Sequence, residues 1–600
     1  MASHFGRTKD LDGRDSIILM RNNAVILTAI IFLVAISPGM AGRVADWGEA
    51  VDEFERKVMA EPSNSTAAAS ETRWLKADTD AVARWQALRF GMFIHWGPVS
   101  LTGQEIGWSR GAETPIEVYD HLYLQFNPFN FNASQWVSIA KAAGMNYIVL
   151  TTKHHDGFCL WDTKQTDYNI MHSPFQRDVV RELAEACKRQ SLAFGAYYSV
   201  CDWHHPDFPL SGPGGNTRRV KSDIDSYNRF LLAQISELIT NYGPLITIWN
   251  DVPQEFKGRG ANTIKLVRSL QPTILINNRT GDGGDYDTPE QRIGKFQLDR
   301  PWESCMTISA HNHWAWGGAQ DGVKSLAACL EMIVRSAGGD GNVLLNVGPR
   351  PDGLIDSEQV ARPKEIGAWL AQNGESIYGT RGGPWKPTPS FASTRRGATV
   401  YLHILRWNGD LIELPNIARQ IKSASLLNGG EVKVEQLGEK LKVTVPAAER
   451  ATPDTVVKLN LNGSAMDLPA LALSPKVEAT ASSVFQKDYA DYGPQNAFDE
   501  DNQTRWATDP ATKRAWIAAS FEKDQTIQGL RVKEACAGRV QRFEFQYRER
   551  NGWKTVFSGT TLGEDFEKRF EPVTAREFRL NILDAAEGPT ISEIVFLREK

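Results

Sequence analysis

The sequence has few cysteines, no excess of basic residues and no repeated or low-complexity segment. Six cysteines among 600 residues, none in a CxxC spacing, exclude a disulfide scaffold and a cysteine-rich zinc module. A formal net charge of −5 and a pI of about 6.2 argue against nucleic acid or an anionic membrane surface as a partner. The 42% hydrophobic share is too high for a disordered chain. With these classes excluded, the composition indicates a folded protein with a large hydrophobic core.

The chain also lacks an apolar run long enough to span a bilayer. The run Ala24–Ile36 is shorter than the ~20 residues that a spanning helix needs, but it has the length of a signal-peptide core. A basic residue precedes it and small residues follow. We therefore predict a signal peptide over residues 1–41, with Met20 as an alternative start, and a secreted or periplasmic protein. A single membrane anchor is the alternative. Residues 42–72 are predicted to be a flexible lead-in.

Short apolar runs alternate with amphipathic segments of helical period between residues 73 and 383. This alternation predicts an α/β fold with a parallel sheet covered by helices. About 300 residues fit a (β/α)8-like TIM barrel, whose chemistry lies at the carboxyl ends of its strands. The rival is a doubly wound sheet, which would gather its polar residues at one switch point rather than after five separate strands. The apolar runs lie at 91–97, 146–155, 193–200, 245–251 and 273–279.

The pattern changes after residue 383. Residues 384–472 contain short alternating strands and turn signals without a helical period, which predicts a β-sandwich. Residues 473–600 continue the all-β pattern with different motifs and are predicted to form a second β domain. The catalytic chemistry is therefore expected in the first domain.

Polar and aromatic residues stand at the ends of the predicted barrel strands. Imidazoles can both donate and accept hydrogen bonds, and indoles offer a flat apolar face. The His-His pair also permits a metal interpretation, which we set aside because adjacent strand residues point to opposite faces. The residues at these ends are His95, His154, His155, Tyr197, Trp249, Asp251 and Arg279.

Seven segments together resemble the α-L-fucosidases of glycoside hydrolase family 29. In chain order they are RFGMFIHWGPVS, TKHHDGFCLWD, GAYYS, IWND, NNR, PWESC and LLNVGPRPDG. The resemblance implies a retaining exo-glycosidase that removes terminal α-L-fucose from glycans or polysaccharides through a covalent fucosyl-enzyme, without a catalytic cofactor. Two alternatives are an exo-glycosidase for a fucose-like sugar such as a β-D-galactoside, and an inactive glycan-binding protein.

The resemblance assigns the nucleophile to Asp251, which ends the W-x-D motif that begins at Trp249. An aspartate at the polar end of an apolar strand suits an oriented, partly buried carboxylate. Taken alone, the same residue could be a helix N-cap.

Glu303 in PWESC is the predicted general acid/base. Its neighbour Trp302 provides an apolar setting that would raise the pKa of the carboxyl group. A structural pairing with Arg300 is the alternative interpretation. Glu105 is the second candidate acid. Many relatives carry an acidic residue immediately before the position of Trp108, and this chain departs from them with Gly107.

The resemblance also implies a fucose pocket. His95, His154 and His155 match the fucose-binding histidines, and the remaining pocket residues are Trp108, Tyr197, Trp249 and Arg279. The sugar is 6-deoxy, so its methyl group needs an apolar surface, for which Trp302 and Trp314 are candidates. His204 and His205 either shape the aglycone side or only their own loop.

The last domain has motifs of its own. ATASSVF, NAFDEDNQTRWAT and ISEIVF resemble the discoidin-like (F5/8 type C) fold of family 32 carbohydrate-binding modules. That resemblance implies a carbohydrate-binding domain over 473–600 and a possible structural Ca²⁺, held by oxygen ligands. An ordinary Asp/Asn-rich turn is the alternative. The implied ligands are Asp499, Asn502, Thr504 and Glu593.

Overall fold

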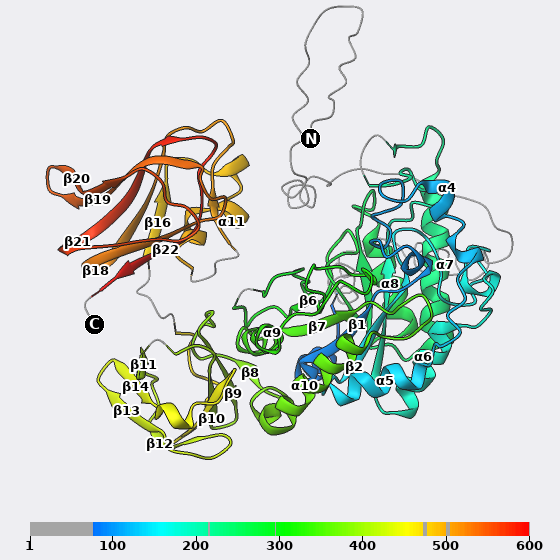
Figure 1. Cartoon of the computed structure of the whole chain (residues 1–600), viewed down its shortest axis with the longest axis horizontal. Coiled ribbons are helices and arrows are strands. Elements are labelled where there is room, and N and C mark those ends of the chain that lie inside the picture. The colour runs from blue at the N-terminus through cyan, green and yellow to red at the C-terminus, as the bar shows by residue number, and fades with distance from the viewer. Residues whose placement is uncertain are drawn as a thin grey trace, which may run out of the picture.

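The computed structural model describes residues 76–213, 217–294, 296–407, 409–471, 477–499 and 504–598. The predicted signal peptide and lead-in lie outside these residues. Within the described ranges, no helix combines the length and the apolar character needed to cross a membrane. Figure 1 shows a helix-rich region in blue to green, followed by two regions built of strands in yellow and in orange to red.

The helix-rich region is built on seven parallel strands in the order β5-β4-β3-β2-β1-β7-β6. Helices alternate with the strands along the chain, except between β5 and β6, where the described residues form no helix. The strands are β1 (Phe90–Ile94), β2 (Tyr147–Lys153), β3 (Ala193–Ser199), β4 (Thr247–Asp251), β5 (Leu275–Ile276), β6 (Glu303–Thr307) and β7 (Asn342–Val347). The main helices are α3 (Thr79–Leu88), α5 (Ala133–Ala142), α6 (Val179–Arg189), α7 (Ile224–Tyr242), α8 (Gly260–Leu270), α9 (Leu326–Gly338) and α10 (Ser357–Asn373).

An irregular segment, residues 286–290, connects the two ends of this sheet. It makes isolated parallel bridges to β6 and its flank (Asp287 to Trp302, Glu290 to Cys305) and to the end of β5 (Tyr286 to Asn277). Eight parallel elements therefore surround one centre, and the predicted (β/α)8-like fold is confirmed. The segment forms only isolated bridges because the polar, glycine-rich stretch around it offers no apolar run to bury.

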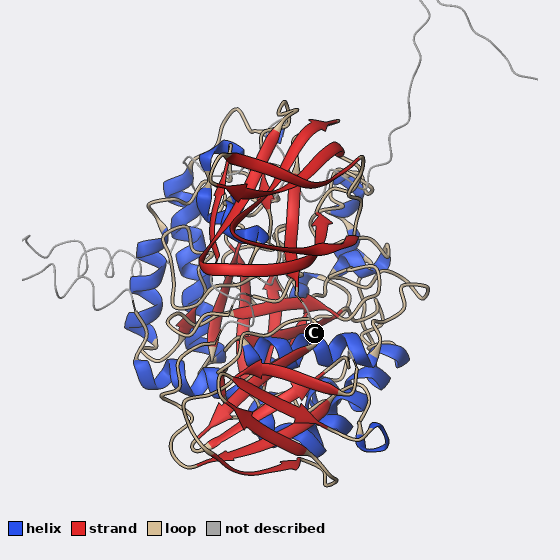
Figure 2. Cartoon of the chain, turned by 90° about the vertical axis from the view of Figure 1, so that its left-hand side faces the viewer, coloured by secondary structure: helices blue, strands red, loops and turns tan. Residues whose placement is uncertain are grey.

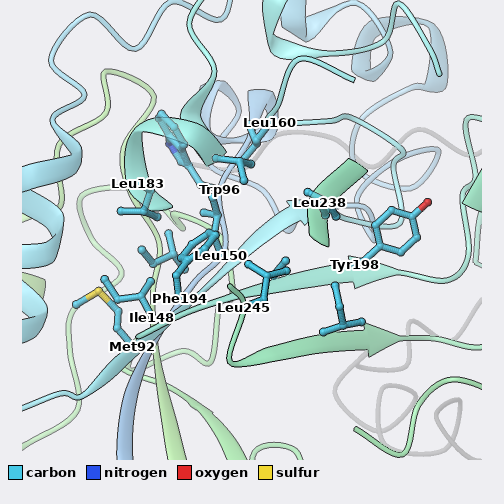
Figure 3. Packing of buried hydrophobic residues seen from close by; sticks show 14 of the residues in the cluster. Met92, Trp96, Ile148, Leu150, Leu160, Leu183, Phe194, Tyr198, Leu238 and Leu245 are labelled. Atoms are coloured by element: carbon cyan, nitrogen blue, oxygen red, sulfur yellow. The ribbon is translucent and has the colours of Figure 1, made fainter. Parts of the chain in front are cut away.

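Strand residues alternate between the barrel interior and the helices. Phe93, Val149 and Trp249 belong to an inner cluster. The intervening residues pack outward, as Figure 3 shows for Ile148, Leu150 and Phe194 with helix residues such as Leu183 and Leu238. Each fully buried side chain of this size stabilises the fold by roughly 1.5–3 kcal/mol. This alternation decides which side chains reach the central site.

Side-chain caps begin several barrel helices. Asn132 caps α5 by accepting from the backbone of Gln135, and Asp178 caps α6 in the same way. Ser325 caps α9 by accepting from the backbone N–H of Ala328. Each such cap contributes about 1 kcal/mol and fixes where a strand-to-helix loop ends.

The other two regions consist mainly of antiparallel strands (Figure 2). The first has sheets ordered β12-β15-β10-β9-β8 and β11-β14-β13. Its strands are β8 (Arg381–Gly382), β9 (Phe391–Arg396), β10 (Thr399–Ile404), β11 (Leu411–Pro415), β12 (Ile421–Leu426), β13 (Lys433–Leu437), β14 (Lys440–Thr444) and β15 (Thr455–Leu461). The last has β16 (Val477–Ala481), β17 (Trp506–Ala507), β18 (Ala515–Glu534), β19 (Val540–Glu549), β20 (Gly552–Gly559), β21 (Phe566–Ala585) and β22 (Thr590–Leu597).

Candidate active site

The carboxyl ends of the barrel strands bring the predicted pocket residues together. Successive ring centroids are 5.5 Å apart for His95 and His154, 3.9 Å for His154 and His155, and 5.4 Å for His154 and Tyr197. Tyr197 stacks on Trp249, and the ring of Trp108 lies 5.4 Å from that of His155. These residues form one continuous aromatic and imidazole surface around the end of β4.

Asp251 is a buried carboxylate surrounded by donors. Its Oδ2 accepts from the Tyr197 hydroxyl at 2.8 Å, and its Oδ1 accepts from Arg279 Nη1 at 2.6 Å and from the backbone of Val252 at 2.9 Å. Burial alone would raise the pKa of Asp251. The charge of Arg279 and the hydrogen bonds from Arg279 and Tyr197 outweigh burial and hold that pKa below its ordinary value. The side chain is therefore ionised and oriented, as a nucleophile requires.

Arg279 joins Asp251 to a second carboxylate, that of Glu290. The same Nη1 atom lies 2.6 Å from Asp251 Oδ1 and 2.9 Å from Glu290 Oε2. These two contacts limit the separation of the two oxygens to at most about 5.5 Å, which is compatible with the ~5–5.5 Å spacing of carboxyl pairs in retaining glycosidases. The Glu290 side chain is 32% exposed, so it can contact a bound molecule.

The three pocket histidines are neutral. Burial lowers the pKa of His95 to about 3 and that of His155 to about 4, and it lowers the pKa of His154 well below its ordinary value. His95 Nδ1 lies 2.6 Å from Asn346 Oδ1, and His155 Nδ1 lies 2.8 Å from Ser199 Oγ. Each of these two rings is thereby held in one orientation. Asn346, near the end of β7, is therefore the residue that orients His95.

Contrary to the prediction from their adjacent positions, His154 and His155 lie side by side and do not point to opposite faces of a strand. Because β2 ends at Lys153, both rings lie beyond the strand, and the ligand atoms of His154, His155 and Asp251 lie within 4.8 Å of one another. The Asp251 carboxylate is nevertheless already bonded to the Arg279 guanidinium, whose positive charge repels a cation. The cluster suits a hydroxylated ligand better than a metal ion.

Glu303 lies at the wrong end of the barrel for the role predicted for it. It is the first residue of β6, is fully buried, and accepts from the Tyr147 hydroxyl at 2.5 Å and from Trp249 Nε1 at 3.1 Å. Burial raises its pKa to about 7, the direction expected from its apolar setting. With both oxygens engaged beneath Trp249, however, it has no access to a leaving group. Arg300 pairs with Asp287 instead, so the alternative pairing does not form either.

Glu290 is a candidate site residue that the sequence did not indicate. It belongs to the segment 286–290, whose polar sequence carries no strand pattern. One sequence signal could have indicated Glu290. It is a carboxylate that follows Arg279, in the stretch that connects β5 to β6 and so remains near the barrel.

Glu105 joins two loops. Its carboxylate accepts from the backbone N–H groups of Trp314 and Ala315, at 2.8 and 3.0 Å, and from that of Ile106. Burial raises the pKa of Glu105, and it outweighs these hydrogen bonds, which lower that pKa. Gly107 has φ 68°, and a Cβ there would lie 2.9 Å from His154 Nδ1. With His154 in this position, a side chain on residue 107 would be strained and crowded.

The two candidate tryptophans for the methyl group lie in different places. Trp314 is at the pocket, with its ring 4.8 Å from that of His95. Trp302 is buried away from it, and its Nε1 donates to Gly339 O at 3.1 Å. Only Trp314 is therefore placed to contact a sugar.

His204 and His205 are built into their own loop. The ring of His204 stacks on Tyr168 at 3.9 Å, and that of His205 packs on Phe230 at 4.5 Å. The backbone N–H groups of both donate to Asp202 Oδ1. The loop-shaping interpretation fits these contacts.

Part of the predicted calcium-ligand set comes together. The Thr504 hydroxyl lies 2.9 and 3.0 Å from the two carboxylate oxygens of Asp499. Glu593 is buried on β22, and Asn502 lies outside the described residues. An all-oxygen set of this kind suits Ca²⁺. The calcium site stays a prediction.

Family models match the barrel region and the last β region of this chain. A family model described as alpha-L-fucosidase matches residues 57–375, and one described as F5/8 type C domain matches residues 478–596. The human plasma alpha-L-fucosidase is 30% identical over 376 residues, which cover 56% of this chain and 78% of that protein.

Solved structures extend the similarity. A Bacteroides thetaiotaomicron GH29 alpha-L-fucosidase, trapped as a covalent intermediate, is 27% identical with a TM-score of 0.58 and covers 65% of this chain and 97% of its own. The alpha-L-fucosidase of Vibrio sp. strain EJY3, 21% identical with a TM-score of 0.64, shares the fold over 87% of this chain and 99% of its own. On the match that spans residues 57–375, this chain belongs to the alpha-L-fucosidase family.

Proposed function

We propose that this protein is a retaining exo-α-L-fucosidase that removes terminal α-L-fucose from glycans or polysaccharides. The observation that carries the assignment of its two catalytic carboxyls is the Arg279 Nη1 atom, which binds both Asp251 and Glu290. The trapped covalent intermediate of the Bacteroides thetaiotaomicron relative supports the retaining reaction.

In the first step, the Asp251 carboxylate attacks the anomeric carbon. The bond from that carbon to the glycosidic oxygen breaks, and Glu290 in its acid form donates a proton to the departing oxygen. The products are a fucosyl ester of Asp251 and the free leaving group. Glu290 replaces Glu303 in this role because Glu290 is accessible beside Asp251 and Glu303 is not.

In the second step, the Glu290 carboxylate takes a proton from water while the water oxygen attacks the same carbon. The ester bond to Asp251 breaks, and fucose leaves with its original anomeric configuration. Arg279 and Tyr197 stabilise the Asp251 carboxylate that is released. No metal or organic cofactor is required by this sequence of bond changes.

The rest of the pocket recognises the sugar. Neutral His95, His154 and His155 offer donors and acceptors to its hydroxyls, and Trp314 offers an apolar surface for its methyl group. We further propose that the predicted signal peptide exports the chain, and that the discoidin-like domain binds carbohydrate and holds one Ca²⁺.

The test compares substrates and stereochemistry. Aryl α-L-fucoside should be hydrolysed, aryl β-D-galactoside should be turned over far more slowly, and NMR of the first product should show α-fucose. A preference for the galactoside would support the alternative sugar specificity. Binding of fucose without turnover of either substrate would identify an inactive glycan-binding protein.

A further inference from the structure

The segment 309–323, which we call the 309–323 loop, continues from β6 on the active-site side of the barrel. An antiparallel bridge between Ser309 and Val323 closes its base. Just beyond the loop, Lys324 Nζ donates to the backbone oxygens of Thr307 and Ser309, at 2.7 and 2.6 Å. The base of the loop is therefore firmly held, and its side chains have defined positions.

Two histidines of this loop are fixed by one aspartate. His311 Nδ1 lies 2.8 Å from the backbone oxygen of Asp321, and His313 Nδ1 lies 2.8 Å from its carboxylate Oδ1. The Asp321 side chain is only 5% exposed, whereas the imidazoles of His311 and His313 are 65% and 41% exposed. The buried residue Asp321 thus fixes both exposed rings, through its backbone oxygen and its carboxylate.

These contacts determine which ring nitrogen of each histidine donates and which accepts a hydrogen bond. A carbonyl or carboxylate oxygen can only accept, so the Nδ1 atom of each ring is the donor. In the neutral imidazoles, Nε2 is then an acceptor. Within the part of the chain that the structure describes, neither His311 Nε2 nor His313 Nε2 has a hydrogen-bond partner. The loop therefore presents two oriented acceptors for hydroxyl donors.

The loop lies between the fucose pocket and the segment that carries the acid. The residue after His313 is Trp314, whose ring contacts His95 in the pocket. On the other side, Gln291 follows Glu290 and its side chain donates to Thr307 Oγ1 at 3.1 Å and to Asn312 O at 3.5 Å. A general acid must lie on the leaving-group side of the scissile bond. The 309–323 loop, which contacts the residue after Glu290, therefore lies on the side of the leaving group.

We propose that His311 and His313 form a subsite for the sugar to which the fucose is attached, with their Nε2 atoms accepting from hydroxyls of that sugar. This inference rests on the proposed fucosidase function and adds the leaving-group residues to it. The chemistry selects a neutral hydroxylated aglycone over an aryl one, because an aryl group has no hydroxyl to donate.

The test is the full-length His311→Ala/His313→Ala double variant, assayed on a fucosylated oligosaccharide and on aryl α-L-fucoside. We expect kcat/KM to fall about tenfold or more on the oligosaccharide, mainly through KM, and less than about twofold on the aryl substrate. The His311→Gln/His313→Gln variant, which keeps an acceptor at each position, should recover part of the loss. His172→Ala is the matched control, since its imidazole is 52% exposed and faces Asp167.

Equal losses on both substrates, or no loss on the oligosaccharide, would overturn the subsite while leaving the fucosidase assignment intact. A wild-type protein that hydrolyses neither fucoside would overturn the proposed function and the subsite with it. Thermal unfolding of each variant separates a binding effect from misfolding. Asp321→Asn should show the same selective loss, more weakly, because it loosens the hold on His313.

Discussion

At the scale of single residues, the site depends on how burial and charge are balanced at each carboxyl group. Asp251 and Glu303 are both buried, and burial opposes ionisation of both. Asp251 has a guanidinium as a partner, while Glu303 has only a phenol and an indole. Their pKa values therefore move in opposite directions, and only Asp251 is suited to be a nucleophile at neutral pH.

Replacement of Asp251 by asparagine should abolish turnover. The variant keeps the size of the side chain but has no nucleophilic oxygen, so kcat on aryl α-L-fucoside should fall roughly 10⁴-fold or more. Asp225→Asn, which removes an exposed carboxylate paired with Arg259, is the control and should retain full activity. Activity within tenfold of wild type in the Asp251→Asn protein would refute the assignment.

Replacement of Glu290 by alanine should discriminate between leaving groups. A poor leaving group needs protonation and an activated aryl group does not, so kcat/KM should fall at least about a hundredfold for an oligosaccharide and much less for an aryl fucoside. Glu303→Gln should show no such dependence on the leaving group. The assignment fails if Glu303→Gln shows the dependence and Glu290→Ala does not.

Glu303 should make stability depend on pH in a defined window. Its pKa rises from 4.5 to about 7 on folding, so between these values the folded chain holds a proton that the unfolded chain releases. Stability should therefore decline as pH rises from about 4.5 to about 7 and level off above it. In Glu303→Gln this component should be absent, which Tm against pH for the two proteins would reveal. Parallel curves would show that Glu303 does not titrate in this way.

At the scale of elements, apolar runs decide what the sequence can predict. Such runs coincide with β1, β2, β3 and β4, so the ends of these strands, and the residues at those ends, could be predicted from the sequence. The segment 286–290 has no run, and Glu290 on it went unnoticed. Glu303 looked suitable from its apolar neighbours, but neighbours in sequence do not say which end of a strand a residue occupies. Only the register, in which Glu303 opposes Asn342 at the start of β7, places it at the far end.

The turn at Gly107 provides a test at this scale. Alanine there has to adopt φ 68° and place its Cβ 2.9 Å from His154 Nδ1. We expect a loss of about 1 kcal/mol in stability and a fall of about tenfold or more in kcat/KM, because His154 has to move. Gly258→Ala is the control, since Gly258 has φ 84° and open space around it. It should lose stability but keep its activity. Equal activity in the two variants would contradict the proposed role of the close approach.

At the scale of the whole molecule, a contact joins the two β regions. Lys386 Nζ donates to the backbone oxygen of Asp499 at 2.7 Å. Asp499 is also one of the predicted calcium ligands, so an ion held there would stiffen the segment that the middle region contacts. Metal binding and the junction between these regions are therefore expected to be coupled.

Removal of calcium should destabilise the last domain without affecting the chemistry. We expect a chelator to lower the Tm of that domain by several degrees, excess Ca²⁺ to restore it, and kcat on aryl α-L-fucoside to stay constant. Asp499→Asn should have a reduced Tm and no response to Ca²⁺. A wild-type Tm that is the same with chelator and with Ca²⁺ would rule the site out.

The irregular segment that closes the barrel also has an evolutionary consequence. Three isolated bridges hold it, so residues can be gained or lost on either side of Glu290 without shifting the register of a strand ladder. The spacing along the chain between nucleophile and acid is then free to drift among homologues while their separation in space is kept. For this family, superposition on the barrel should identify the acid more dependably than counting residues from the nucleophile.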